Sequence, residues 1–151
     1  MQNIVFKRLT PQEVAESKGF SRLLEGYSSE CANQSLGAVH PDMDLYELYH
    51  NSGMLDITGA FDGERLIGVV AVLVSPLAHF SQKTAVTESF YLAPEYRGQG
   101  LGRKLLAHAM QFAASKGVKG LYVSAPTGSR LERIAKAAGL RQTNSVFFVE
   151  V

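Results

Sequence analysis

The stretch Phe90-Tyr-Leu-Ala-Pro-Glu-Tyr-Arg-Gly-Gln-Gly-Leu-Gly-Arg-Lys-Leu105 carries three glycines within five positions, at 98, 100 and 102. The apolar residues before Pro94 predict the end of a strand, and those from Leu101 onward recur at helical spacing. Glycines between a strand and a helix let several backbone N–H groups converge at the positive end of the helix dipole. We therefore predict a phosphate-binding turn, flanked by the guanidinium groups of Arg97 and Arg103.

Two common nucleotide-binding loops fit this turn poorly. A dinucleotide fingerprint needs Gly-x-Gly-x-x-Gly and an acidic residue about twenty positions later. Here the third glycine comes too early, at Gly102, and the following strand, which ends near Ser124, has no Asp or Glu. A Walker-type loop needs Gly-Lys-Ser/Thr, which the sequence Gly102-Arg103-Lys104 does not supply. The remaining alternatives are another phosphate ligand or a turn that binds nothing.

The sequence Arg97-Gly98-Gln99-Gly100-Leu101-Gly102 resembles the acyl-coenzyme A loop of the GNAT (Gcn5-related N-acetyltransferase) family, whose signature is Arg/Gln-x-x-Gly-x-Gly/Ala. The resemblance is strong from about residue 56 to residue 151 and weak before that. It implies that acetyl-CoA is the cosubstrate, with its pyrophosphate on the glycine turn and its pantetheine arm along the preceding strand. The cofactor-binding residues implied in this way are Phe90, Leu92, Arg97, Gly98, Gln99, Gly100, Leu101, Gly102 and Arg103.

The remaining sequence predicts strands first and then alternating strands and helices. Asp62-Gly63 is a hairpin turn signal between two apolar runs, and Ser75-Pro76 predicts the end of the second run. Thr10 and Pro11 predict the start of a helix, and the following residues up to Asn51 are loosely helical, with a second helical stretch around Leu45. Predicted strands are 4–9, 55–61, 66–74, 84–92, 120–124 and 146–151, and predicted later helices are 101–116 and 129–138.

These elements predict one α+β domain over residues 1–151, with a GNAT-like mixed, mostly antiparallel sheet flanked by helices. The resemblance implies an N-acyltransferase that moves acetyl from acetyl-CoA to a primary amine by direct attack. The amine belongs to a small molecule or to a protein. Two alternatives on the same fold are a weak or inactive acyl-CoA-binding module and a protein-interaction adaptor.

An acceptor amine has to lose a proton before it can attack. For a lysine-like amine, deprotonation at pH 7 costs about 4 to 5 kcal/mol. Glu88, two residues before Phe90, is the candidate base, because family members often carry an acidic residue on this strand. The alternative is an ordinary surface carboxylate, with His79 as the second candidate base.

Many GNAT enzymes place a tyrosine four residues before the glycine of the late helix, where it protonates the departing thiolate. Counting back from Gly139 reaches Ala135, so this sequence departs from the family pattern. A thiolate leaves tolerably well without a proton donor, so the departure weakens catalysis without abolishing it.

Other candidate residues have two interpretations each. Tyr46, Tyr49 and His50 either line an acceptor pocket or belong to the core. Cys31 has no partner histidine nearby in the sequence and is interpreted as a small buried hydrophobe.

The composition limits the class of protein and its partners. The 151 residues are 46% hydrophobic and 19% charged, which is typical of a globular domain. Fifteen basic and 14 acidic residues give a net charge of +1, so we expect no nucleic-acid or membrane partner. Neither a monomer nor a homodimer is excluded by the composition. Cys31 is the single cysteine, and the longest apolar run, 66–74, is too short to span a bilayer. We expect a cytoplasmic protein without a metal site.

Overall fold

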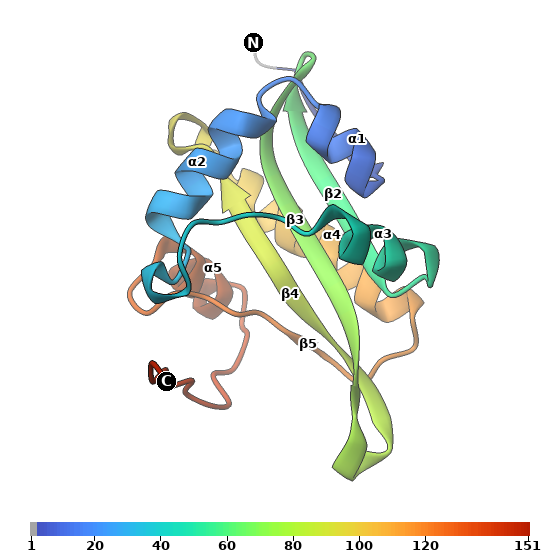
Figure 1. The fold of residues 1–151 in the computed structure, drawn as a ribbon. Helices are drawn as coiled ribbons and strands as arrows, with labels where there is room; N and C mark the ends of the chain where they lie inside the picture. Colours follow the sequence, from blue (N-terminus) through green and yellow to red (C-terminus); the bar gives the residue numbers. More distant parts are fainter. Residues whose placement is uncertain (1–2) are drawn as a thin grey trace.

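The computed structural model describes residues 3–151 and shows a five-stranded sheet in the order β1-β2-β3-β4-β5 (Figure 1). The first four strands are antiparallel to their neighbours, whereas β4 and β5 are parallel. This confirms the predicted mixed, mostly antiparallel sheet. The strands are β1 Ile4–Leu9, β2 Leu55–Asp62, β3 Arg65–Leu77, β4 Gln82–Leu92 and β5 Leu121–Tyr122.

Helices cover both faces of the sheet, as Figure 1 shows. Helix α4 packs on one face, and α1, α2 and α3 lie over the other. Thr10 caps α1 with a complete capping box, which confirms the predicted start at Pro11. The helices are α1 Pro11–Glu16, α2 Phe20–Glu30, α3 Met43–Asn51, α4 Leu101–Ser115 and α5 Arg130–Ala137, with 3₁₀ turns η1 Gln34–Leu36, η2 Ala78–Phe80 and η3 Pro94–Tyr96.

Strand β3 separates two parts of the core. Its alternate residues point to opposite faces of the sheet. Val70 and Val72 are almost fully buried in the cluster that includes α4 residues such as Leu105. Ala71 belongs instead to the cluster on the side of α1 and α2. Both faces of β3 are covered, and this explains why its sequence is apolar at nearly every position.

The predicted strand over residues 146–151 is wrong. No strand of the described sheet pairs with these residues, and Phe147 is 92% exposed. The predicted strand over 120–124 shrinks to the two residues of β5. A short β5 has few backbone groups to offer a further strand, and β-propensity without a pairing partner does not form a sheet.

The predicted break at Ser75-Pro76 is also wrong, because β3 continues to Leu77 and pairs with β4 as far as Gln82. The pairing of β2 with β3 starts at Leu55 opposite Leu73, so the far end of β3 has a partner on one side only. A proline is tolerated on such an edge, where a backbone N–H is not needed.

Among residues 3–151, no helix is both long enough and apolar enough to cross a membrane.

Candidate active site

Strands β4 and β5 part after two residue pairs. Ala85 lies opposite Leu121 and Val86 opposite Tyr122, and the pairing ends there. Beyond it, the N–H of Ser124 donates to the side-chain hydroxyl of Thr87 over 3.0 Å. The opening that follows is a cavity of about 560 Å³, here called the splay cavity. Its walls include Thr87, Phe90, Leu92, Gly98, Gly100, Gly102, Arg103, Ser124, Pro126, Arg130 and Ile134.

The glycine turn forms one end of the splay cavity and is shaped to receive a group from outside. Gly98 and Gly100 have φ of +81° and +79°, a region that favours glycine. A side chain at either position would point into open space. Gly100 is the N-cap of α4 and has no side chain to bond the first N–H groups, which lack partners within the helix. These residues therefore fit a bound phosphate.

Not every residue implied by the resemblance reaches the splay cavity through its side chain. Phe90, Leu92, Gly102 and Arg103 line it, but the side chain of Leu101 is buried in the core and Gln99 is not part of the wall. Gln99 and Leu101 can therefore contact a phosphate only through their backbone N–H groups.

The guanidinium of Arg97 is already engaged. Its Nη1 and Nη2 atoms donate to the two carboxylate oxygens of Glu30 over 2.7 Å each, and its Nε atom donates to the carbonyl of Leu92 over 2.8 Å. This hydrogen-bonded pair raises the pKa of Arg97 and lowers the pKa of Glu30. Arg97 therefore ties the end of α2 to the end of β4, while Arg103 and Arg130 remain on the wall as cationic groups.

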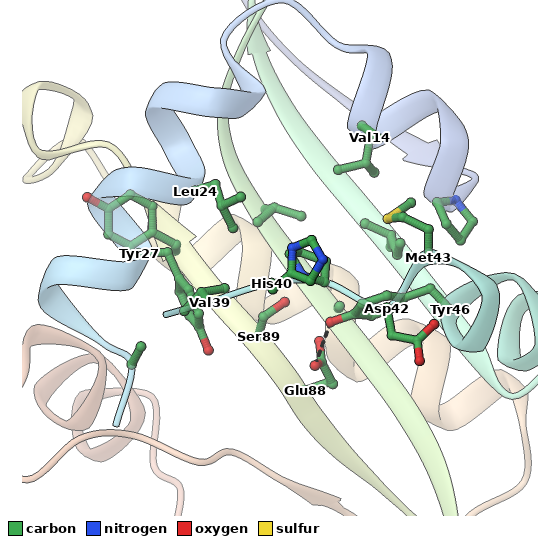
Figure 2. A pocket seen from close by; sticks show the side chains of 18 of the residues that line it. Val14, Leu24, Tyr27, Val39, His40, Asp42, Met43, Tyr46, Glu88 and Ser89 are labelled. Atoms are coloured by element: carbon green, nitrogen blue, oxygen red, sulfur yellow. Dashed lines mark hydrogen bonds between the residues drawn. The ribbon is translucent and has the colours of Figure 1, made fainter. Parts of the chain in front are cut away.

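A second cavity, of about 520 Å³, lies between the sheet and the segment 11–49; we call it the acceptor-side cavity (Figure 2). Val69 and Leu73 of β3 line its floor, and Tyr46 and Tyr49 of α3 line one wall. The loop between α2 and α3 crosses the sheet and brings His40 to the cavity. Both interpretations of Tyr46 and Tyr49 apply, because their side chains line this cavity and also pack against the core; His50 is not part of this wall.

The two cavities meet at the middle of β4. A ligand in one cavity therefore comes close to a ligand in the other at this point. The residues that line both are Tyr27, Cys31, Ala32, Asn33, Glu88, Ser89 and Tyr91.

Glu88 occupies this meeting point because of a β-bulge. Thr87 lies opposite Val72 and Ser89 lies opposite Ala71, so Glu88 is an extra residue with no counterpart in β3. In a regular strand Thr87 and Ser89 would share a face; here they pair with residues on opposite faces. Bulges of this kind redirect side chains near functional sites. Glu88 is thereby placed between the splay cavity and the acceptor-side cavity.

The Glu88 carboxylate has neutral hydroxyl neighbours. The Tyr46 hydroxyl donates to its Oε1 atom over 2.7 Å, as the dashed line in Figure 2 shows. Burial and this hydrogen bond raise the pKa of Tyr46, and burial followed by the charge of Glu88 raises the pKa of Tyr27. Both tyrosines therefore stay protonated near neutral pH.

The other candidates from the sequence are placed less favourably. His79 lies in η2 at the tip of the β3–β4 hairpin, packs its ring at a tilt against Phe80 and lines neither cavity. Burial raises the pKa of the Cys31 thiol, which makes it a poorer nucleophile. Helix α5 brings Leu131 and Ile134, but no tyrosine, to the splay cavity.

Several lining residues escaped sequence interpretation. Tyr27 on α2 and Ser89 on β4 reach both cavities, and Thr87 and Ser124 line the splay cavity. Hydroxyl residues such as these are common on any strand or loop. No spacing signal marked them in the sequence.

A sequence model of the acetyltransferase (GNAT) family matches residues 19–139, most of the chain. The chain belongs to the GNAT family. This GNAT protein is 28% identical over 126 residues to "Uncharacterized N-acetyltransferase YjgM" of Escherichia coli (strain K12), which covers 81% of this chain and 72% of that relative.

Solved structures share the GNAT fold along nearly the whole chain. A predicted acetyltransferase with acetyl-CoA from Clostridium acetobutylicum superposes with a TM-score of 0.69 at 14% identity, covering 98% of this chain and 96% of that one. The aminoglycoside acetyltransferase meta-AAC0020 in complex with sisomicin, from an uncultured soil metagenomic sample, has a TM-score of 0.73 at 16% identity, with the same coverage. As a member of the GNAT family, this protein is an acetyl-CoA-dependent N-acetyltransferase.

Proposed function

We propose that the protein transfers acetyl from acetyl-CoA to a primary amine by direct attack of the amine on the thioester, with Glu88 as the base. The observation that carries this proposal is that two cavities meet at Glu88, one ending at the glycine turn and the other under α1–α3. Acetyl-CoA supplies the activated acetyl group in the splay cavity. The amine reaches the thioester from the acceptor-side cavity.

The reaction needs one proton acceptor and no covalent intermediate on the protein. The ammonium form of the acceptor first passes one proton to the Glu88 carboxylate, directly or through water. The neutral nitrogen then forms a bond to the acetyl carbon, the carbon–sulfur bond breaks, and the second proton leaves the nitrogen for water. Tyr46 holds that carboxylate in place through its hydrogen bond. The sulfur leaves as the thiolate of coenzyme A and takes a proton from water; α5 brings no tyrosine to the splay cavity for this step.

Backbone N–H groups of β4 are available to polarise the thioester carbonyl. The N–H of Ala93 donates to Ile67 in β3 over 2.8 Å. Because successive N–H groups of a strand point to opposite edges, those of Leu92 and Phe90 point toward the splay cavity. Donors aimed at a developing oxyanion stabilise it most in a partly dry cavity.

Coenzyme A and acetyl-CoA are expected to raise the thermal stability of the protein. A ligand present at a hundred times its Kd adds about 2.7 kcal/mol to the free energy of unfolding. For a chain of this length, that corresponds to a rise in Tm of roughly 5 °C or more, measured by differential scanning fluorimetry. NAD and ATP serve as controls and should shift Tm much less. Absence of any shift with either coenzyme A form at millimolar concentration would contradict the proposed site.

A further inference from the structure

The acceptor-side cavity is mostly apolar. Strand β3 contributes Val69 and Leu73, and α2 contributes Leu24 with the ring of Tyr27. The α2–α3 loop and α3 contribute further apolar side chains, those of Val39, Met43 and Leu45. Figure 2 shows Val14, Leu24, Val39 and Met43 arranged around the space in front of Glu88. A molecule that fills this cavity is therefore mainly in contact with carbon.

Two carboxylates line this cavity, Asp42 and Glu88, and both are partly engaged. The Asp42 Oδ1 atom accepts the backbone N–H of Leu45 over 3.0 Å and so caps α3. The Glu88 Oε1 atom accepts the Tyr46 hydroxyl. Glu30, which lines the adjoining splay cavity, is bonded to both Nη atoms of Arg97. The cavity can thus balance few positive charges on a bound ligand.

We propose that the acceptor is a primary amine with one cationic nitrogen attached to an apolar body, aliphatic or aromatic, that lies in the acceptor-side cavity. This inference rests on the proposed function in one respect, namely that the reactive nitrogen faces Glu88. The apolar body then lies over Val69 and Leu73 and against Leu45. A polycationic amine fits poorly, because each additional buried charge without a partner is costly.

A homologous series of acceptors tests the apolar part directly. Thiol release from acetyl-CoA is measured with n-propylamine, n-butylamine, n-hexylamine and n-octylamine, and with 2-phenylethylamine. Burial of one methylene contributes about 0.8 kcal/mol, so kcat/KM should rise about fourfold for each added methylene until the cavity is filled. Spermidine and sisomicin are the polycationic arms and should be turned over far less efficiently than n-hexylamine. A flat series, or preference for spermidine or sisomicin, would overturn the proposal.

Helix α3 provides a matched pair of variants. Leu45 and Leu48 are both exposed leucines, 42% and 63%, on the same helix, but only Leu45 lines the cavity. Leu45→Asn should raise KM for n-hexylamine roughly fourfold to tenfold with kcat little changed, because apolar contact is lost without a change in the base. Leu48→Asn should leave KM within about twofold. Equal effects of the two variants would contradict the placement of the apolar body.

A binding measurement separates this inference from the proposed function. Titration calorimetry of the protein with n-hexylamine and with spermidine requires no turnover. If no amine releases thiol but n-hexylamine binds saturably and Leu45→Asn weakens it selectively, the acetyl-transfer proposal fails while the ligand class stands. If thiol is released from acetyl-CoA with spermidine better than with n-hexylamine, the acetyl transfer stands and the ligand class is wrong. If n-hexylamine neither binds saturably in calorimetry nor supports thiol release, the proposed ligand class is wrong.

Discussion

Glu88→Gln should lower turnover by about 10² to 10⁴ while leaving the affinity for coenzyme A nearly unchanged. Glutamine keeps the volume of the side chain, and its amide oxygen can still accept the Tyr46 hydroxyl that now bonds Oε1 of Glu88. Its basicity is lost, so the amine has to reach the thioester already deprotonated. Thiol release with a good acceptor gives kcat, and calorimetry with coenzyme A gives Kd.

The pH profile provides a second measurement on the same variant. Turnover of the unmodified protein should level off near neutral pH, whereas Glu88→Gln should keep gaining activity as the free-amine fraction rises toward a pKa of about 10. Glu64→Gln, an exposed position in the β2–β3 turn, is the control and should match the unmodified protein. Near-normal turnover of Glu88→Gln with an unchanged profile would assign the proton acceptor elsewhere.

Gly100→Val should weaken coenzyme A binding by about 100-fold, which corresponds to loss of two charge-assisted hydrogen bonds from the glycine turn. The side chain of residue 100 would enter open space beside the first N–H groups of α4. A phosphate could then no longer approach them closely. Calorimetry with coenzyme A measures the loss, and circular dichroism verifies that the variant still unfolds cooperatively.

Gly117→Val is the matched control for backbone strain. Gly117 has a φ of +65°, and a side chain there also meets nothing, but it follows the opposite end of α4. Both variants therefore carry a similar conformational cost of about 1 to 2 kcal/mol. Equal loss of binding in the two would point to strain, and normal binding by Gly100→Val would place the phosphate elsewhere.

Local signals made much of the fold predictable. The Asp62-Gly63 turn, the apolar runs beside it and the cap at Thr10 all act within a few residues, and the structure has β2, β3 and α1 where these signals placed them. The glycine turn was predictable for the same reason, because a helix N-terminus preceded by glycines exposes backbone N–H groups that favour an anion. The candidate base was found only because a family resemblance drew attention to the strand.

Features that depend on distant partners were not predictable. The bulge at Glu88 is defined by its register against Ala71 and Val72, and a single strand's sequence does not contain that register. Arg97 was expected to face phosphate, but Glu30, 67 positions away, takes its guanidinium. The acceptor-side cavity needs α2 close to β4, an approach possible because Gly26 has no side chain to meet Tyr91.

The unpaired segment Val146–Val151 affects how the protein behaves at high concentration. Its six residues, Val-Phe-Phe-Val-Glu-Val, combine high β-propensity with one charge and no proline or glycine, the composition of segments that stack into cross-β aggregates. Phe147 is 92% exposed and Val149 is 76% exposed, so one copy presents this stretch directly to another. Concentrated solutions should therefore self-associate. Phe147→Lys adds a charge at a position that lines neither cavity. This variant should stay monodisperse in dynamic light scattering up to a higher protein concentration than the unmodified protein.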